Sequence, residues 1–171
     1  YDGSGNQTGH VDLAYDEDGN SLVGYHHAIE GGEVGRLEFE YNADGHLIRA
    51  EFYDETGSLV DYTLFEYDPA GNCIRREQYG KDGELWSVAV IEYNEQGKRT
   101  RDSRYGREGE LYGYYLYEYD TEGNPSEEVY YDADGQLINR KVYRYDEEGN
   151  NIGYEYYDGE GNLEQSVMNE G

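Results

Sequence analysis

The chain has 171 residues and carries 13 Lys and Arg against 39 Asp and Glu, which gives a net charge of −26. Nucleic acid is not an expected partner, because phosphate binding needs a basic surface. No apolar run approaches the roughly 20 residues of a membrane span, since the longest aliphatic stretch is Val88 to Ile91. Aliphatic residues are few, but 22 Tyr supply the apolar bulk for a core. The composition therefore predicts one repetitive, tyrosine-rich and acidic domain.

A fixed period runs from one end of the sequence to the other. A tyrosine opens every half-unit except one, where His27 stands instead, and a glycine follows each opening position four residues later. Shorter and longer half-units alternate without interruption, so two consecutive ones, for example residues 41–66, form a double unit of constant length. We predict a single repeat domain over residues 1–171, made of 13 half-units that start at residues 1, 15, 27, 41, 53, 67, 79, 93, 105, 119, 131, 145 and 157.

Each half-unit starts with a hairpin-turn signal, as in the run from Tyr131 to Leu137. Asp at the second position can accept backbone N–H bonds from residues further on, and Gly supplies a positive φ. Such a turn places Tyr53 opposite Leu59 and leaves strands of roughly 7 to 10 residues between turns. The sequence predicts an all-β fold: a tandem β-hairpin repeat whose antiparallel meander forms an extended or spirally coiled sheet.

Strict alternation assigns side chains to two faces of this sheet. Tyr62 and Leu64 fall on a face that we expect to point inward, whereas Phe65 and Tyr67 fall on the other face. The same rule adds Ile48, Ala50, Phe52, Trp86, Val88, Val90, Tyr112, Tyr114 and Leu116 to the inward face. It adds Arg49, Glu51, Arg75 and Glu77 to the face of Phe65.

The run Tyr67-Asp68-Pro69-Ala70-Gly71-Asn72 and its copies resemble the YD repeats of the bacterial Rhs proteins and related surface proteins. The resemblance covers nearly the whole chain. It implies strands that coil into a spiralling shell, and a protein that is secreted or attached to the cell surface. The sequence departs from the family where Asn, Gln, Glu or Ser follows the turn glycine, and it has no Asp-Pro-x-Gly-Leu motif.

Acidic turns are candidates for divalent-cation binding, because calcium prefers carboxylate and carbonyl oxygens. The candidate ligands are Asp16, Asp18, Asp132 and Asp134. Capping of the turn explains the same residues and is the alternative. We expect no cofactor other than calcium at these turns.

Tyrosines near the turns form the richest aromatic patch, and planar rings can stack on sugars or hold quaternary ammonium groups. The candidate ligand-binding residues are Tyr115, Tyr117, Tyr119, Tyr143 and Tyr145. Stacking of the rings on one another is the alternative. A basic run next to this patch is expected to pair with acidic residues across strands, and a local phosphate site is its alternative; the run comprises Lys98, Arg99, Arg101, Arg104 and Arg107.

No nucleophile, phosphate-loop or zinc motif interrupts the repeat, so we predict a protein that is not an enzyme. The expected function is adhesion or binding of a cell-wall polymer, a glycan or a protein partner, at the surface of a bacterium or outside it. The alternative is a structural spacer or shell segment of a larger exported protein. Such a segment could self-associate through the open edges of its sheet.

Overall fold

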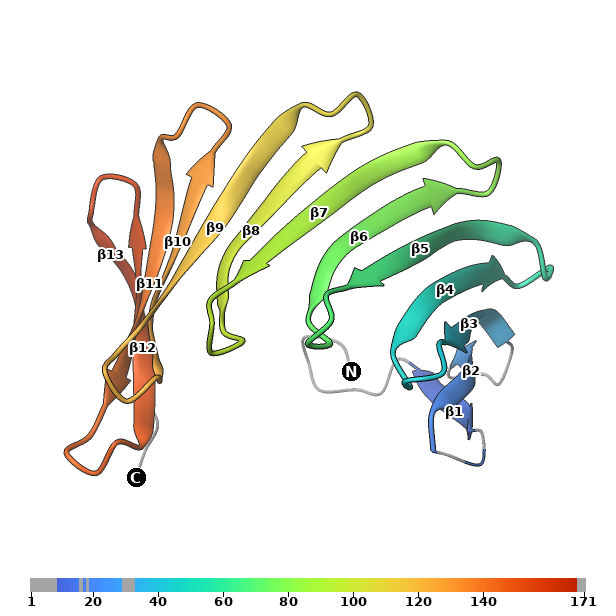
Figure 1. The fold of residues 1–171 in the computed structure, drawn as a ribbon, viewed down its shortest axis with the longest axis horizontal. Helices are drawn as coiled ribbons and strands as arrows, with labels where there is room; N and C mark the ends of the chain where they lie inside the picture. Colours follow the sequence, from blue (N-terminus) through green and yellow to red (C-terminus); the bar gives the residue numbers. More distant parts are fainter. Residues whose placement is uncertain (1–8, 16, 18, 29–32, 169–171) are drawn as a thin grey trace. The chain divides into compact units, whose positions relative to one another are not determined.

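A computed structural model describes residues 9–15, 17, 19–28 and 33–168. The strands of this part of the chain form one antiparallel meander in sequence order, as predicted (Figure 1). Their bounds are β1 Gly9–Tyr15, β2 Ser21–Ala28, β3 Glu33–Tyr41, β4 Leu47–Asp54, β5 Leu59–Tyr67, β6 Cys73–Gly80, β7 Leu85–Tyr93, β8 Arg99–Gly106, β9 Leu111–Tyr119, β10 Pro125–Asp132, β11 Leu137–Tyr145, β12 Asn151–Asp158 and β13 Leu163–Met168.

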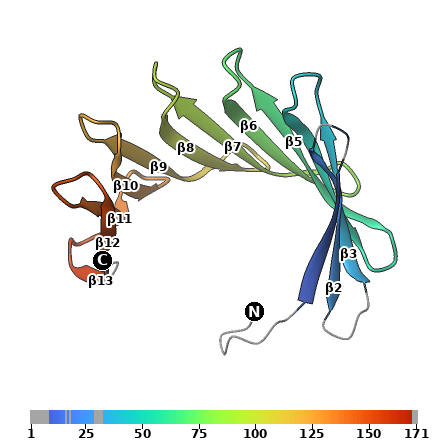
Figure 2. The same cartoon turned by 90° about the horizontal axis from the view of Figure 1, so that it is seen from below.

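The chain divides into two compact units, Tyr1–Ser87 and Val88–Gly171, called unit 1 and unit 2. Within each unit the described strands lie in a single layer, and Figure 2 shows this layer from a second direction. No helix in the described residues is long and apolar enough to cross a membrane. That 1–171 is one domain stays a prediction.

The turns have the predicted chemistry. The turn glycine has a positive φ of 73–87° in each half-unit where the structure describes it, for example at Gly57 and Gly71. Asp54 closes its turn by accepting the N–H of Thr56 at 2.8 Å and of Ser58 at 3.0 Å on Oδ1. The Thr56 hydroxyl, which also donates to Asp54 Oδ1, and then these backbone bonds stabilise the carboxylate and lower the pKa of Asp54.

The predicted face assignment is wrong from one strand to the next, because a β-bulge lies beside the turn in each hairpin whose register the structure describes. Tyr53 pairs with Leu59 as expected, but the register then skips Val60 and pairs Phe52 with Asp61. One extra residue reverses the alternation for the rest of the strand. Glu51 therefore lies opposite Tyr62, not on the face of Phe65.

The two faces of the sheet carry different side chains. The arginine face carries Arg49, Glu51, Tyr62, Glu77 and Tyr79 in unit 1, and Arg101, Tyr114, Leu116, Tyr131 and Tyr157 in unit 2. The tyrosine-pair face takes its name from tyrosines that stand two positions apart in one strand. It carries Ala50, Phe52, Thr63, Phe65 and Tyr67 in unit 1, and Asp102, Tyr115, Tyr117, Tyr119, Tyr143 and Tyr145 in unit 2.

Neither face is the inward one that alternation predicted, because a single layer leaves both faces in contact with water. Trp86 and Tyr112, both expected to be buried, have 41% and 56% of their surface exposed. Among the described residues, the buried hydrophobic side chains are Val88, Ile91 and Val129, all in unit 2. Most other side chains are half-buried, so apolar contact runs across each face between neighbouring strands.

Arg–Glu–Tyr networks recur on the arginine face. In β6, Arg75 Nε donates to Glu77 Oε1 at 2.8 Å, and the Tyr79 hydroxyl donates to Glu77 Oε2 at 2.7 Å. Arg49, Glu51 and Tyr53 repeat this arrangement in β4. Because each carboxylate receives hydrogen bonds from both sides, the network fixes the tyrosine ring and the arginine stem above the sheet.

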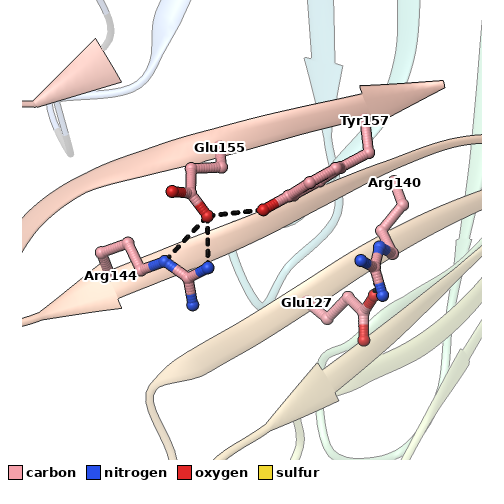
Figure 3. Close-up of polar contacts among 5 residues, drawn as sticks. All are labelled: Glu127, Arg140, Arg144, Glu155 and Tyr157. Carbon is pink, nitrogen blue, oxygen red and sulfur yellow. Dashed lines mark hydrogen bonds and ion pairs between the residues drawn. The ribbon is translucent and has the colours of Figure 1, made fainter. Parts of the chain in front are cut away.

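Unit 2 builds the same network from two strands (Figure 3). Arg144 of β11 contacts Glu155 of β12, and the Tyr157 hydroxyl donates to Glu155 Oε2 at 2.7 Å. Next to it, Arg140 lies 3.3 Å from Glu127 Oε1 and 4.8 Å from the centre of the Tyr157 ring. Cross-strand charge and cation–π contacts thus replace aliphatic packing on this face.

A hydroxyl clasp recurs on the tyrosine-pair face. Tyr67 at the end of β5 donates its hydroxyl to the carbonyl of Leu47 at the start of β4, at 2.8 Å. Tyr119 and Tyr145 close the hairpins β8–β9 and β10–β11 in the same way, at 2.9 and 2.8 Å. Each clasp joins the open end of a hairpin, opposite its turn.

Candidate functional site

A hollow of about 320 Å³ lies on the tyrosine-pair face of unit 2, where the ends of β7 and β9 meet the starts of β8 and β10. Three tyrosines, one arginine, one proline and three glutamates line it: Tyr93, Tyr117, Tyr119, Arg99, Pro125, Glu118, Glu127 and Glu128. The volume is at the lower end of the range for small-molecule sites. Aromatic walls with a few charged groups suit a ligand that has both apolar and hydroxyl surfaces.

The clasp of the β8–β9 hairpin fixes one wall of the hollow. Tyr119 donates its hydroxyl to the Arg99 carbonyl at 2.9 Å, which holds its ring beside the hollow. The Lys98 ammonium lies 5.1 Å from the centre of the same ring and contacts the Gly123 carbonyl. A ring held from two sides loses little further freedom when a ligand stacks on it.

Arg99 is the cationic group of the hollow. Its guanidinium lies 5.5 Å from the centre of the Tyr117 ring and 3.8 Å from Asp102 Oδ2. Burial opposes its charge, but hydrogen bonding to the Tyr117 hydroxyl and nearby acidic groups outweigh it and raise the pKa of Arg99. Burial also raises the pKa of Tyr117, so its hydroxyl stays protonated at neutral pH.

Asp102 is the most deeply buried polar side chain near the hollow, with 2% of its surface exposed. Arg104 Nε lies 3.8 Å from its Oδ1, the oxygen other than the one nearest Arg99. In the register, Asp102 pairs with Tyr115 of β9. A carboxylate flanked by two guanidinium groups holds both arginines on the tyrosine-pair face.

Glu128 is the glutamate of the hollow that lies on the same face as Tyr117. Tyr143 of β11 donates its hydroxyl to Glu128 Oε1 at 2.5 Å. Burial first, and then this hydrogen bond, raise the pKa of Tyr143 well above its usual value. Lys141 lies opposite Glu128 in the register, with its ammonium 4.5 Å from the Tyr143 ring centre. The hollow therefore offers a hydrogen-bond donor in Arg99 and an acceptor in Glu128.

All five tyrosines predicted as ligand-binding residues lie on the tyrosine-pair face. Tyr117 and Tyr119 line the hollow, and Tyr143 contacts its Glu128. Tyr115 packs on Tyr117, with ring centres 6.3 Å apart, and Tyr145 donates its hydroxyl to the Pro125 carbonyl at 2.8 Å. Their role in binding stays a prediction.

Sequence reasoning did not find Tyr93, Arg99 or Glu128 as members of this site. The repeat could have predicted Tyr93, because Tyr93 precedes the predicted site residue Tyr119 by one double unit. The positions of Arg99 and Glu128 depend on the bulge that decides which face each strand presents, and no sequence motif marks them.

The basic run was expected to pair with acidic residues across strands, but its cross-strand partners are tyrosine rings of β9. The Arg101 guanidinium lies 3.9 Å from the Tyr114 ring centre, and Arg104 lies 5.5 Å from that of Tyr115. The acids that the run does contact are local: Arg99 and Arg104 each lie 3.8 Å from Asp102 of the same strand, and Arg107 lies 3.8 Å from the adjacent Glu108. Tyrosines take the place of the expected cross-strand acids because a long cationic side chain covers the ring on the neighbouring strand.

The acidic turns use their carboxylates within the turn. Asp132 Oδ1 accepts the N–H of Asp134 at 3.0 Å and of Gln136 at 2.8 Å. Asp16 and Asp18 lie outside the described residues. In the part of the chain that the structure describes, three or more His, Cys, Asp or Glu side chains do not come together as a metal site. Calcium binding stays a prediction.

No family model and no curated protein matches this chain. Among solved structures, it is similar to a Tc holotoxin pore from Photorhabdus luminescens, with 14% identity over 95% of this chain and 12% of that chain and a TM-score of 0.33. It is also similar to a TcdB2–TccC3 complex without its hypervariable C-terminal region, with 14% identity over 90% of this chain and 11% of that chain and a TM-score of 0.35. A porin-like protein from Bacteroides uniformis has 11% identity over 94% of this chain and 88% of that chain, with a TM-score of 0.45. The chain thus spans about an eighth of the first toxin chain, and these likenesses assign no activity.

Proposed function

We propose that this chain is a non-enzymatic repeat module, secreted or displayed at a bacterial cell surface, that binds a glycan or cell-wall polymer in the hollow of unit 2. The observation that carries the proposal is the lining of the hollow: the rings of Tyr93, Tyr117 and Tyr119 stand beside the charged groups of Arg99 and Glu128. Sugars offer an apolar C–H face to aromatic rings and hydroxyls to charged groups, and this lining can meet both at once.

The charge of the chain adds a preference among glycans. A net charge of −26 repels anionic polymers at low ionic strength. Neutral or amino-substituted polysaccharides are therefore the favoured class, and tyrosine rings also attract an ammonium group.

Affinity electrophoresis and titration calorimetry test the proposal with neutral, cationic and anionic polysaccharides and with isolated bacterial cell wall. We expect saturable retention that Tyr117→Ala weakens at least tenfold, whereas Tyr117→Phe keeps the ring and most of the affinity. Tyr112→Ala is the matched control, because Tyr112 is 56% exposed and lies outside the hollow. Equal affinity of Tyr117→Ala and the parent, or retention on no polymer, would overturn the proposal.

Two additions to the same assay separate the sources of binding. Loss of retention with a chelator would assign it to calcium at the acidic turns, and loss with free choline would assign it to the aromatic rings. Retention that survives both additions and still depends on Tyr117 would favour sugar stacking in the hollow.

A structural spacer is the second candidate, and the hydroxyl clasps favour it. Tyr67, Tyr119 and Tyr145 each close a hairpin, which makes the repeat a regular series of braced modules. Such a segment would function by its length and stiffness, or by self-association along its sheet edges. Light scattering over a wide concentration range tests self-association: rising mass supports it, and a constant monomer mass argues against it.

A further inference from the structure

Two pairs of tyrosines on the arginine face stack across neighbouring strands in nearly the same geometry. Tyr62 of β5 lies directly opposite Tyr79 of β6, with ring centres 5.1 Å apart and planes inclined by 11°. Tyr114 of β9 lies opposite Tyr131 of β10, at 5.2 Å and 18°. The second pair repeats the first after two double units, so the two pairs differ mainly in what surrounds them.

The surroundings differ at several positions, since Glu51 and Arg75 are replaced by Ser103 and Glu127 in the second pair. The difference that bears on oxidation lies beside Tyr79. Tyr79 donates its hydroxyl to Glu77 Oε2 at 2.7 Å, and Glu77 is fixed by Arg75. In β10, the residue two positions before Tyr131 is the buried Val129, so the second pair lacks a carboxylate at that position. The hydrogen bonds from Tyr79 and Arg75 lower the pKa of Glu77, which stays ionised at neutral pH as a proton acceptor.

We propose that Tyr62 and Tyr79 form an oxidative cross-linking site, at which a one-electron oxidant of the peroxidase and hydrogen peroxide class joins the two rings covalently. Each phenol loses one electron and one proton, and the two phenoxyl radicals form a bond between the carbons ortho to their hydroxyls. The hydrogen of each ortho carbon then returns to the oxygen of its own ring. Overall the protein loses two hydrogen atoms, and one hydrogen peroxide is reduced to two waters.

Glu77 favours oxidation of Tyr79 over the other tyrosines of the two pairs. Removing an electron from a phenol makes its hydroxyl strongly acidic, and a carboxylate within hydrogen-bond reach takes up that proton as the electron leaves. The Arg49 guanidinium lies 4.2 Å from the Tyr62 ring centre and disfavours positive charge on that ring. Tyr79 therefore loses the first electron, and Tyr62, which is stacked on it, is the ring with which it couples.

The cross-link would join two side chains that the structure already holds against each other, with ring centres 5.1 Å apart. The two residues face each other in the strand register, and both rings are half-buried on the same face. The product would lock β5 to β6 on the side away from the clasp of Tyr67.

The experiment treats the whole chain, at low concentration, with a haem peroxidase and limiting hydrogen peroxide, and follows the products by mass spectrometry after trypsin digestion. The next basic residues on either side of the two tyrosines are Arg49, Arg75, Arg76 and Lys81, so the expected product joins peptides 50–75 and 77–81 with the loss of two hydrogens. A Tyr114–Tyr131 link stays inside peptide 108–140 and is located by fragmentation.

We expect the Tyr62–Tyr79 link to form roughly a hundredfold faster than the Tyr114–Tyr131 link, which is the low end of a positioned base's effect. Glu77→Gln should abolish this advantage and leave the Tyr114–Tyr131 rate unchanged. Tyr79→Phe should remove the link while keeping the stacked ring. Glu155→Gln is the matched control, because Glu155 makes the same bond to Tyr157 in the other unit.

Equal rates for the two links in the parent would overturn the proposal. So would a Tyr62–Tyr79 link that forms in Glu77→Gln as fast as in the parent. Products that join different chains only would also overturn it. Circular dichroism of each variant before oxidation shows whether the sheet is intact, so a slow link in a folded Glu77→Gln chain supports the proton-acceptor role.

Discussion

Alanine at a turn glycine gives the most direct test of the turn geometry on which every hairpin depends. Gly109 has a φ of +83°, and a Cβ built on it would meet no heavy atom within 4 Å. Gly109→Ala therefore adds no clash, and its cost is that of holding an L-residue in the left-handed region, roughly 1–2 kcal/mol. For a chain of this size each kcal/mol lowers the melting temperature by roughly 2–4 °C.

Thermal melting by circular dichroism measures this cost, and amide exchange locates it. We expect Gly109→Ala to melt roughly 2–8 °C below the parent, with faster exchange at Gly109, whose N–H donates to the Gly106 carbonyl at 3.1 Å. Gly109→Asn should lower the melting temperature less than Gly109→Ala does, because Asn tolerates the left-handed region. Glu108→Ala is the control on the same exposed turn and should stay within about 0.5 kcal/mol of the parent.

The reasoning would be refuted if Gly109→Ala melted with the parent, or if Asn and Ala cost the same. A companion substitution separates backbone from contact: Gly123 has nearly the same φ of +87°, but its added Cβ would overlap the Lys98 ammonium. Gly123→Ala should therefore cost more than Gly109→Ala, because it also displaces Lys98 from the Tyr119 ring.

Three further predictions concern the clasp, the core and the carboxylates. Tyr119→Phe removes one hydroxyl clasp and should lower the free energy of unfolding by about 1 kcal/mol in urea titration; no loss would show that the bond to Arg99 contributes nothing net. Ile91→Ala truncates a side chain that is 3% exposed and should lower the free energy of unfolding by about 2–5 kcal/mol, whereas Ile91→Val should lower it by about 0.5–1.5 kcal/mol. Similar losses for both would mean that the surrounding side chains close the cavity that alanine leaves. The hydrogen bonds from Tyr79 and Arg75 lower the pKa of Glu77 from 4.5. The contribution of Glu77 to the free energy of unfolding is therefore present above pH 4.5 and is lost as the pH falls through the lowered pKa. Urea titrations at pH 7 and pH 3 should show the stability gap between the parent and Glu77→Gln shrinking in acid, and a gap independent of pH would contradict this linkage.

The turns were predictable because their chemistry is local. Asp at the turn start and Gly four residues after the tyrosine act within a few residues of each other, and Asp54 and Gly57 have the expected bonds and φ. The constant length of the double unit then fixes strand order, because consecutive hairpins form a meander. All-β class, antiparallel pairing and approximate strand bounds follow from these short-range signals.

The faces were not predictable from alternation, because a bulge changes the parity of a whole strand. The skipped residue Val60 leaves Tyr53 opposite Leu59 as expected, yet it moves Glu51 to the face of Tyr62. Both hydrophobic patterns look alike in sequence, since tyrosines occur on both faces. The candidate site was therefore only half visible: its tyrosines share the repeat, whereas Arg99 and Glu128 join it through the register of four strands.

The clasp has a consequence for how such a chain can grow or shrink during evolution. Residues 47–67 form a closed piece, because the hydroxyl at the last residue reaches the carbonyl at the first residue and the turn joins the two strands between them. A duplication or deletion that respects this piece and its linker changes the chain by one whole double unit and leaves every remaining hydroxyl with its acceptor. A cut through the middle of the piece separates a phenol from its carbonyl. Recombination should therefore be tolerated in whole clasped hairpins, which would keep the shorter and longer half-units alternating without a break, as they do along this sequence.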